Sequence, residues 1–339
     1  MSLETHERNL LMKRVVITDF VNDSLAIERA IFGNAASCEA LDATCERELT
    51  GKIEDADAVM MYHTLRLSAE AIARLRHCRL IVRCGVGFDN VDHAFARQRG
   101  IDVVNVPDYG TEEVADSAIG MALTLARGIH RYNVSLRDGN ESWTYALARP
   151  LHRLRGRVFG IVGLGRIGMA TAVRAKALGM DVRFYDPFKP DGYDKAIGIM
   201  RAESLQELME QAFILSLHCP LNDQTRQLID AETLRWLPPG SYLVNTARGG
   251  VVDAQAVVAA IADGHLAGAA LDVLVDEPPL ADSAVISAWK DPRHPAHQRL
   301  ILNPHAAFYC EEGFAEMRRK GAESCLRALT GQPLRNVVN

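Results

Sequence analysis

The stretch from Val158 to Gly168 constrains the fold more than any other part of the chain. Its apolar run over 158–162 leads into Gly163-Leu164-Gly165-Arg166-Ile167-Gly168, and a helical pattern follows as far as residue 178. In a strand–turn–helix unit, the first of these glycines allows a tight turn, the second lets the backbone approach a pyrophosphate, and the third lets the helix pack on the strand. The N-terminus of the helix supplies unpaired N–H groups to an anion. The motif therefore predicts a dinucleotide-binding turn in a parallel sheet.

A carboxylate follows this motif at the position that bears on the choice of dinucleotide. Asp186 stands at the end of the next predicted strand, over 182–185. An acidic residue there would bind the hydroxyls of the adenine ribose and repel a 2′-phosphate. The alternative interpretation is that the glycines serve only a turn. The strand, the helix, the second strand and the acidic residue together favour NAD binding over that alternative, and NAD over NADP.

Short β-rich runs alternate with amphipathic segments from Arg14 onward, which predicts an α/β protein with parallel sheets. Strands are predicted at 15–18, 58–62, 80–84 and 102–105, and in a second series at 158–162, 182–185, 214–218, 243–246, 269–273 and 300–302. A long helix over 111–137 is expected to act as a connector, and a last helix over 311–330 to return to the first block. We expect two doubly wound domains, one over 1–110 and 306–339 and the other over 111–305.

Composition disfavours several classes of function. The chain has 339 residues, with 38 Lys and Arg against 43 Asp and Glu, so its net charge of −5 favours neither nucleic acid nor an anionic membrane. We see no apolar run long enough to cross a bilayer and no signal-peptide pattern, and we expect a cytoplasmic location. The seven cysteines include no C-x-x-C pair, so neither disulfides nor a metal site is predicted. His294 and His297 are interpreted as solvated residues of a Pro-rich surface loop over 277–298.

Three polar residues stand just after predicted strands, where parallel sheets place their ligands. They are Arg248, Glu277 and His305. Each alone is ambiguous, because arginines in surface salt bridges, solvated Glu-Pro turns and structural histidines are common. Together with NAD they provide what hydride transfer to a 2-keto acid requires. The guanidinium grips the carboxylate of the acid, the histidine moves the proton, and the glutamate orients the histidine.

Three further sequences resemble the signatures of the D-isomer-specific 2-hydroxyacid dehydrogenases. They are VNTARGGVVD at 244–253, GAALDV at 268–273 and NPHAA at 303–307. With the glycine motif, the resemblance covers nearly the whole chain. It implies a discontinuous flavodoxin-like substrate-binding domain, a Rossmann NAD-binding domain and a homodimer formed through the latter. It also implies the NAD-dependent interconversion of a small 2-keto acid and its D-2-hydroxy acid, with Arg248, Glu277 and His305 as catalytic residues.

The same resemblance assigns further contacts. Those implied for the cofactor are Gly163, Gly165, Arg166, Ile167, Gly168, Asp186, Cys219, Pro220, Thr225, Thr246, Ala247, Asp272 and Val86. Those implied for the substrate are Val86, Gly87, Arg248, His305 and Phe308.

Within the family, Phe88-Asp89-Asn90 and the sequence over 305–309 are most similar to the C-terminal binding proteins, which are NAD-dependent corepressors. Phe308 stands where those proteins place a tryptophan. This likeness implies an alternative function, an NAD(H)-sensing module that binds protein partners and has weak dehydrogenase activity. The spacing from Glu277 to His305 is longer than the family's, so the Pro-rich loop between them is interpreted as an insertion.

Overall fold

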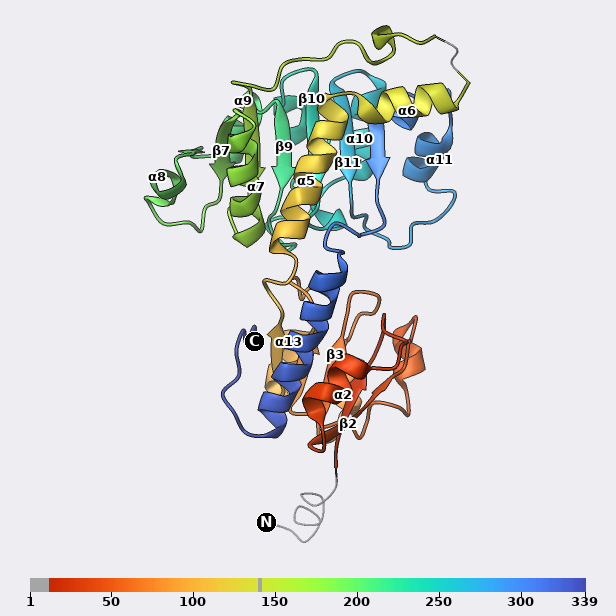
Figure 1. Ribbon diagram of the computed structural model, residues 1–339, viewed down its shortest axis with the longest axis vertical. Helices are drawn as coiled ribbons and strands as arrows, with labels where there is room; N and C mark the ends of the chain where they lie inside the picture. The colour runs from red at the N-terminus through yellow and green to blue at the C-terminus, as the bar shows by residue number, and fades with distance from the viewer. Residues whose placement is uncertain (1–11, 140–141) are drawn as a thin grey trace. The chain divides into compact units, whose positions relative to one another are not determined.

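The structure is a computed structural model that describes residues 12–139 and 142–339. The chain divides into two compact units (Figure 1). Unit 1 contains the chain as far as Gly110 together with Cys310–Asn339, and unit 2 contains Thr111–Tyr309.

The second crossing between the units lies at Cys310, and not at residue 306 as the sequence predicts. Hydrogen bonds account for the difference. The backbone N–H groups of Ala306 and Ala307 donate to the carboxylate of Asp272, and Ser117 Oγ donates to the carbonyl of Ala307. These bonds keep the residues that follow His305 in unit 2.

Unit 1 is built on a five-stranded parallel sheet with the order β2-β1-β3-β4-β5. Helices cover both faces, so most of its strands are nearly continuous apolar runs. The strands are β1 (Lys13–Ile17), β2 (Ala36–Ala40), β3 (Ala58–Met61), β4 (Leu80–Arg83) and β5 (Asp102–Asn105); the helices are α2 (Ala26–Phe32), α3 (Ala69–Arg74), α4 (His93–Gln98) and α13 (Glu311–Leu329). The sequence did not predict β2, an edge strand of mixed exposure.

The C-terminal helix α13 packs on β3 and β4 and against α2 (Figure 1). A Cβ on Gly321 would come within 2.7 Å of Cys84 Sγ, so glycine allows the helix to lie close to the sheet. Nearby on α13, Arg318 is 4% exposed and donates to both carboxylate oxygens of the fully buried Glu28, each at 2.7 Å. Arg318 also donates to Asp23, and this hydrogen bond holds the pKa of the Asp23 carboxyl below its ordinary value. The helix is therefore fastened to α2 by a buried ion pair.

Unit 2 is built on a seven-stranded parallel sheet with the order β12-β11-β10-β9-β6-β7-β8. The strands are β6 (Val158–Val162), β7 (Asp181–Tyr185), β8 (Met200–Arg201), β9 (Ile214–Leu217), β10 (Ser241–Asn245), β11 (Leu266–Leu271) and β12 (Leu300–Leu302). The helices are α5 (Thr111–Ala126), α6 (Ile129–Arg137), α7 (Arg166–Ala177), α8 (Tyr193–Ile197), α9 (Leu205–Gln211), α10 (Ala254–Ala262), α11 (Ala284–Lys290) and α12 (Ala296–Arg299). The predicted class is confirmed: unit 1 has the flavodoxin-like strand order, and unit 2 has the Rossmann order with one additional edge strand.

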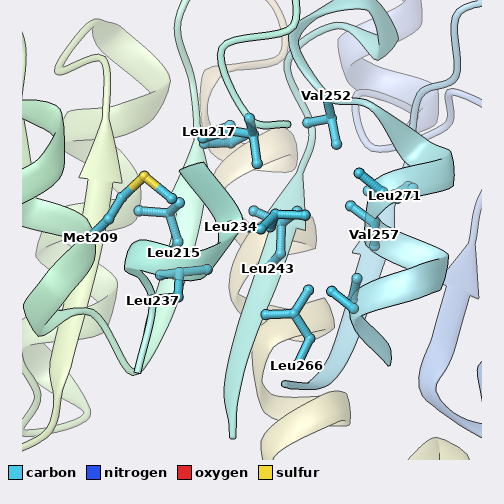
Figure 2. Close-up of a cluster of buried hydrophobic side chains, with 14 of the residues drawn as sticks. Met209, Leu215, Leu217, Leu234, Leu237, Leu243, Val252, Val257, Leu266 and Leu271 are labelled. Atoms are coloured by element: carbon cyan, nitrogen blue, oxygen red, sulfur yellow. The ribbon is translucent and has the colours of Figure 1, made fainter. Parts of the chain in front are cut away.

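Two apolar clusters cover the two faces of this sheet. Figure 2 shows the first, in which Leu215, Leu243 and Leu271 of neighbouring strands meet Met209 of α9 and Val257 of α10. The second contains side chains of α5 and α7 packed on the opposite faces of the same strands. Because both faces are filled, the strands are held rigidly, and the loops at their carboxyl ends start from fixed positions.

The expected connector helix is in fact two helices of unit 2. Gly128, with φ +67°, ends the first helical run, and α6 starts after it. α5 packs on α7 and on the sheet, so it belongs to the core of unit 2.

The expected surface loop over 277–298 contains α11 and α12, so this prediction is wrong. Ser283 caps α11 by accepting a hydrogen bond from Ile286 N. The ring of His297 is half-buried rather than solvated, with Nε2 2.9 Å from Asp138 Oδ2 and Nδ1 2.8 Å from the Trp289 carbonyl. His297 therefore holds α12 at the C-terminal end of α6. The sequence did not predict α11 and α12 because prolines interrupt their helical pattern.

No helix among the described residues is both long and apolar enough to span a membrane. In the same part of the chain, no group of three His, Cys, Asp or Glu side chains could hold a metal ion. All seven cysteines are free thiols. Burial raises the pKa of both Cys78 and Cys84 to about 12, so these thiols stay protonated near neutral pH.

Removal of Arg318 should destabilise unit 1 strongly. In Arg318→Ala the Glu28 carboxylate stays buried without its counter-ion, which costs about 3–5 kcal/mol of unfolding free energy. Arg319→Ala is the matched control, because Arg319 pairs with Glu316 and Glu323 at exposed positions, where such pairs contribute about 0–1 kcal/mol. Urea unfolding followed by circular dichroism measures both variants. Equal midpoints would contradict the role of the buried pair.

Candidate functional site

The glycine turn lies at the carboxyl end of β6, in the interior of the sheet of unit 2. Gly163 has φ +89°, and a Cβ there would come within 2.8 Å of the backbone nitrogen of Cys219. A Cβ on Gly168 would overlap the carbonyl oxygen of Gly163. Gly165 differs, since nothing lies within 4 Å of the position of its Cβ. The turn is therefore closely packed at two glycines and open at the third.

The open side of the turn is also the start of α7. Gly165 is the N-cap, and Arg166 and Ile167 are the first helical residues, so their N–H groups have no partner within the helix and carry the positive end of its dipole. Asp186 lies beside the turn at the end of β7. Its carboxylate accepts hydrogen bonds from Leu164 N at 2.8 Å and Phe188 N at 3.0 Å. The acidic side chain is thus held in place by the turn itself.

Two buried polar atoms at this edge lack a hydrogen-bond partner in the described part of the chain. They are Nδ1 of His218, which follows β9, and Oγ1 of Thr246, which follows β10. Buried polar atoms in folded proteins are nearly always paired, so unpaired atoms at the ligand edge of a sheet indicate room for a bound group. The open side of Gly165, the start of α7 and these two atoms fit a dinucleotide.

The two residues directly after β9, His218 and Cys219, are both neutral near pH 7. Burial lowers the pKa of His218 to about 3. Burial, together with the nearby Asp186 carboxylate, raises the pKa of Cys219 to about 11. Thr225 Oγ1 donates to the carbonyl of Pro220 at 2.6 Å, which closes the loop. The start of this loop therefore offers a neutral imidazole and no thiolate nucleophile.

A buried asparagine shapes the turn that carries Arg248. Asn245 is fully buried; its Oδ1 accepts from Ala247 N and its Nδ2 donates to the carbonyl of Arg248, both at 3.0 Å. The next residue, Gly249, has no room for a Cβ, which would overlap the backbone carbonyl of Leu274. The Arg248 turn is therefore pressed directly against the loop that leads to Glu277.

Glu277 and His305 form a pair. Oε2 of Glu277 lies 2.7 Å from Nδ1 of His305, and Oε1 accepts a hydrogen bond from Leu274 N at 2.9 Å. Both side chains are partly exposed, at 33% for Glu277 and 20% for His305. Because one ring nitrogen faces the carboxylate, the other, Nε2, points away from it. The arrangement fixes the orientation of an imidazole that can give or take a proton at Nε2.

Asp272 holds the backbone around this histidine. It is 1% exposed, and its carbonyl accepts the N–H of His305 at 2.7 Å while its carboxylate accepts those of Ala306 and Ala307. Burial raises the pKa of Asp272, and the two backbone N–H groups oppose that rise. His305 consequently keeps a left-handed φ of +53°, which few residues other than glycine adopt.

The remaining predicted residues fall in both units. Phe308 is buried beside His305, with ring centroids 6.3 Å apart at 81°. Val86 and Gly87 lie in unit 1 after β4, where the Val86 carbonyl accepts from Asn105 Nδ2 at 2.7 Å. The structure thus gathers the unit 2 candidates at one sheet edge and places Val86 and Gly87 at the carboxyl edge of the other sheet.

Sequence reasoning missed three features of this edge. It did not single out His218 or Asn245, and it named Asp272 only as a cofactor contact. His218 follows an apolar strand directly, so the rule that located Arg248 would have found it. The hydrogen bonds of Asn245 and Asp272 depend on turns and contacts that the local pattern does not contain.

The comparisons with known proteins agree on one family. A family model described as D-isomer specific 2-hydroxyacid dehydrogenase, NAD binding domain, matches residues 119–307. The chain is 32% identical over 324 residues to C-terminal-binding protein 1 of Caenorhabditis elegans, covering 93% of this chain and 43% of that protein. It is 32% identical over 328 residues to D-3-phosphoglycerate dehydrogenase of Methanocaldococcus jannaschii, covering 97% of this chain and 60% of that protein. The chain therefore spans less than two thirds of the length of either relative.

A solved structure extends the likeness to the whole fold. D-lactate dehydrogenase from Aquifex aeolicus, complexed with NAD and lactic acid, matches with a TM-score of 0.82 at 26% identity, covering 94% of this chain and 96% of that one. The resemblance inferred from the motifs is confirmed, and so is NAD as a cofactor of the family domain that the chain carries. Because the family model matches more than half of the chain, the chain belongs to the D-isomer specific 2-hydroxyacid dehydrogenase family, and unit 2 carries its NAD-binding domain.

Proposed function

We propose that the protein is an NAD-dependent oxidoreductase that interconverts a small 2-keto acid and its D-2-hydroxy acid. The observation that carries the proposal is the Glu277–His305 pair, 2.7 Å apart, on the same sheet edge as the glycine turn. A proton carrier of fixed orientation beside a dinucleotide site is what this reaction needs. The family and the solved relatives support it.

The cofactor is proposed to lie along the carboxyl edge of the unit 2 sheet. The N–H groups at the start of α7 would hold its pyrophosphate, and Asp186 would bind its adenine ribose. The other residues proposed to contact it are Cys219, Pro220, Thr225, Thr246, Ala247 and Asp272. When bound, NAD supplies or accepts the hydride at C4 of its nicotinamide ring. Val86 in unit 1 stays a predicted cofactor contact.

His305 is the proposed acid and base. In reduction its Nε2 donates a proton to the keto oxygen as the hydride reaches C2, and in oxidation it takes the hydroxyl proton. Glu277 keeps the ring in place through Nδ1. Asp272 fixes the backbone that carries the ring.

Arg248 is proposed to grip the carboxylate of the substrate. A guanidinium offers two parallel N–H donors to a carboxylate, and the turn fixed by Asn245 presents it next to the Glu277 loop. Phe308 would border the substrate beside His305. Val86 and Gly87 of unit 1 stay predicted substrate contacts.

One second candidate is favoured by the identity with C-terminal-binding protein 1. It is an NAD(H)-sensing module that binds protein partners and has weak dehydrogenase activity. Turnover separates the two candidates. A kcat/KM of about 10⁴ M⁻¹s⁻¹ or more for some 2-keto acid is ordinary for an enzyme, whereas far slower turnover with NADH-dependent peptide capture would favour the module.

The partners proposed are the small acid and a second copy of this chain. Exposed apolar side chains on and after α6 support the dimer: Ile129, Leu136, Trp143 and Tyr145 are 56%, 37%, 89% and 69% exposed. Neither nucleic acid nor a membrane is a proposed partner. A cytoplasmic location stays a prediction from the sequence.

Gly165→Ala should weaken NADH binding without loosening the fold. The position of the new methyl group is open in the protein alone, so the methyl group fills space proposed for the cofactor. We expect the Kd for NADH, from fluorescence titration, to rise about tenfold or more, which is about 1.4 kcal/mol, with an unchanged melting temperature. Gly168→Ala is the control, because its methyl group meets the Gly163 carbonyl and should lower the melting temperature. An unchanged Kd in Gly165→Ala would count against the cofactor position.

His305→Gln should lower kcat for the reduction of 2-keto acids by about 10²–10⁴, because the amide cannot donate a proton as imidazolium does. Steady-state assays that follow NADH absorbance measure the loss, and the Kd for NADH should stay within about twofold of the wild type. The exposed His152 gives the control His152→Gln, which should retain full activity. Equal kcat in both variants would remove His305 from the reaction.

Trp143→Ser combined with Tyr145→Ser should convert a dimer into monomers. Both side chains are exposed in the single chain, and the polar replacements remove the apolar area that a second copy would cover. Sedimentation equilibrium at micromolar concentration measures the change. Met200→Ser is the control, since Met200 is 45% exposed on β8, far along the chain from α6. A wild type that is monomeric at these concentrations would refute the dimer.

A further inference from the structure

Unit 1 contains a pocket of about 250 Å³ that is lined by α13, by the residues that follow this helix and by the carboxyl end of β5. We call it the α13 pocket. Its lining includes four cationic side chains, those of Arg319, Lys320, Arg327 and Arg335. The carboxyl edge of a parallel sheet is where ligands bind. None of the residues assigned above to the cofactor or the substrate lines this pocket.

Carboxylates pair with two of the four cations. Lys320 Nζ lies 2.8 Å from Asp108 Oδ1, and a guanidinium nitrogen of Arg319 lies 2.6 Å from Glu323 Oε1. Both of these acids line the pocket. Glu316, which is outside the lining, also contacts Arg319 and Lys320. The acidic side chains at the pocket are therefore engaged by Arg319 and Lys320.

The other two cations, Arg327 and Arg335, form no ion pair within residues 12–139 and 142–339. Arg327 donates to the carbonyl of Pro333 at 3.3 Å. It also lies in the last turn of α13, where a cation stabilises the helix dipole, so its charge has a structural explanation. Arg335 lies beyond the helix and has no such explanation. Two guanidinium groups on one small pocket repel each other, and an anion between them would remove that repulsion.

Hydrogen bonds to β5 fix the backbone beside Arg335. The carbonyl of Asn336 accepts the N–H of Asn105 at 3.2 Å, and the N–H of Val338 donates to the carbonyl of Val103 at 2.9 Å. Figure 1 shows the chain turning back beside α13 after the helix ends. Because the residues after Arg335 are bound to the sheet, its guanidinium is attached to a fixed part of the backbone. Little ordering of the backbone is then needed when an anion binds.

We infer that the α13 pocket binds a small phosphate-bearing anion, with Arg327 and Arg335 as its principal donors. A phosphate group carries a charge of about −1.5 to −2 near neutral pH and three acceptor oxygens. A guanidinium matches such oxygens with two parallel N–H donors. The two unpaired arginines supply two positive charges, which suits a phosphate better than a monocarboxylate. The volume is below the roughly 300–1,000 Å³ of pockets for drug-sized ligands, which suits inorganic phosphate or a small phosphate ester.

Arg335→Gln tests the inference. Isothermal titration calorimetry with inorganic phosphate at constant ionic strength, with NADH at saturation, measures binding while the glycine turn of unit 2 is filled. We expect a Kd of about 1 mM or below for the wild type. The variant should raise this Kd by about tenfold or more, because it removes charged hydrogen bonds to the anion. Its melting temperature without phosphate should be unchanged, since Arg335 is exposed and forms no ion pair in the described part of the chain.

Arg76→Gln is the matched control. Arg76 is 61% exposed, belongs to unit 1 and lies outside the pocket lining, so this variant removes the same charge elsewhere. Its Kd for phosphate should stay within about twofold of the wild type. An equal rise in both variants would attribute the effect to net charge and overturn the inference. Arg327→Gln should weaken binding as Arg335→Gln does, which makes the test independent of a single variant.

Two further ligands define the chemical class. Acetate has a single charge and two oxygens, so it should bind about tenfold more weakly than phosphate or worse. Acetate binding as tight as that of phosphate would contradict the phosphate class. Glycerol 3-phosphate distinguishes the two sources of a phosphate group: a Kd below that of inorganic phosphate identifies an ester as the ligand, and a higher Kd identifies inorganic phosphate.

The result that would overturn the inference is a wild type that binds no phosphate, or a Kd that is the same in the wild type and both arginine variants of the pocket. Neither result affects the proposed function, because no residue of the α13 pocket takes part in the proposed reaction and the experiment measures no turnover.

Discussion

The buried carboxyl group of Asp272 holds the functional edge of unit 2 in place. The carboxylate and the backbone carbonyl of Asp272 accept the N–H groups of His305, Ala306 and Ala307. One residue directly after β11 therefore fixes three consecutive residues of the segment that follows β12. Backbone dipoles, rather than a neighbouring arginine or lysine, oppose the effect of its burial. The left-handed φ of His305 and the position of its ring beside Glu277 follow from this anchorage. The position at which the chain leaves unit 2, after Tyr309, also follows from this anchorage.

The parts of the fold that could be predicted from the sequence have local causes. The strand at 158–162, its glycine turn and the following helix are specified within twenty or so residues by apolar patterning and the steric needs of three glycines. The parts that could not be predicted depend on partners far along the chain. β2 is an edge strand with alternating exposure and few β-branched residues. α11 and α12 lie among prolines that interrupt their helical pattern. α12 is held by the contact of His297 with Asp138, the residue that ends α6. Gly128 divides a helical pattern that looks continuous from apolar spacing alone.

In the candidate site, too, the features with local causes could be predicted from the sequence and the others could not. Arg248, Glu277 and His305 could be located because each follows an apolar strand, and parallel strands bring their carboxyl ends to one edge. The pairing of Glu277 with His305 through Nδ1 agrees with the chemistry expected of those residue types. What holds them could not be predicted, since the contact of Gly249 with Leu274 and the bonds of Asn245 need the folded turns.

The ion pair between Glu28 and Arg318 joins residues 290 positions apart, and this separation sets the order of events during synthesis. Ribosomes add about 5–20 residues per second, so Glu28 emerges roughly 15–60 s before its partner. In that interval the face of the first sheet that α13 later covers has no helix from the C-terminal segment, and the glutamate has no guanidinium. Unit 2 is one continuous stretch and has all its strands before α13 is made. The ion pair that fastens α13 to α2 can therefore form only after all the strands of unit 2 have been synthesised.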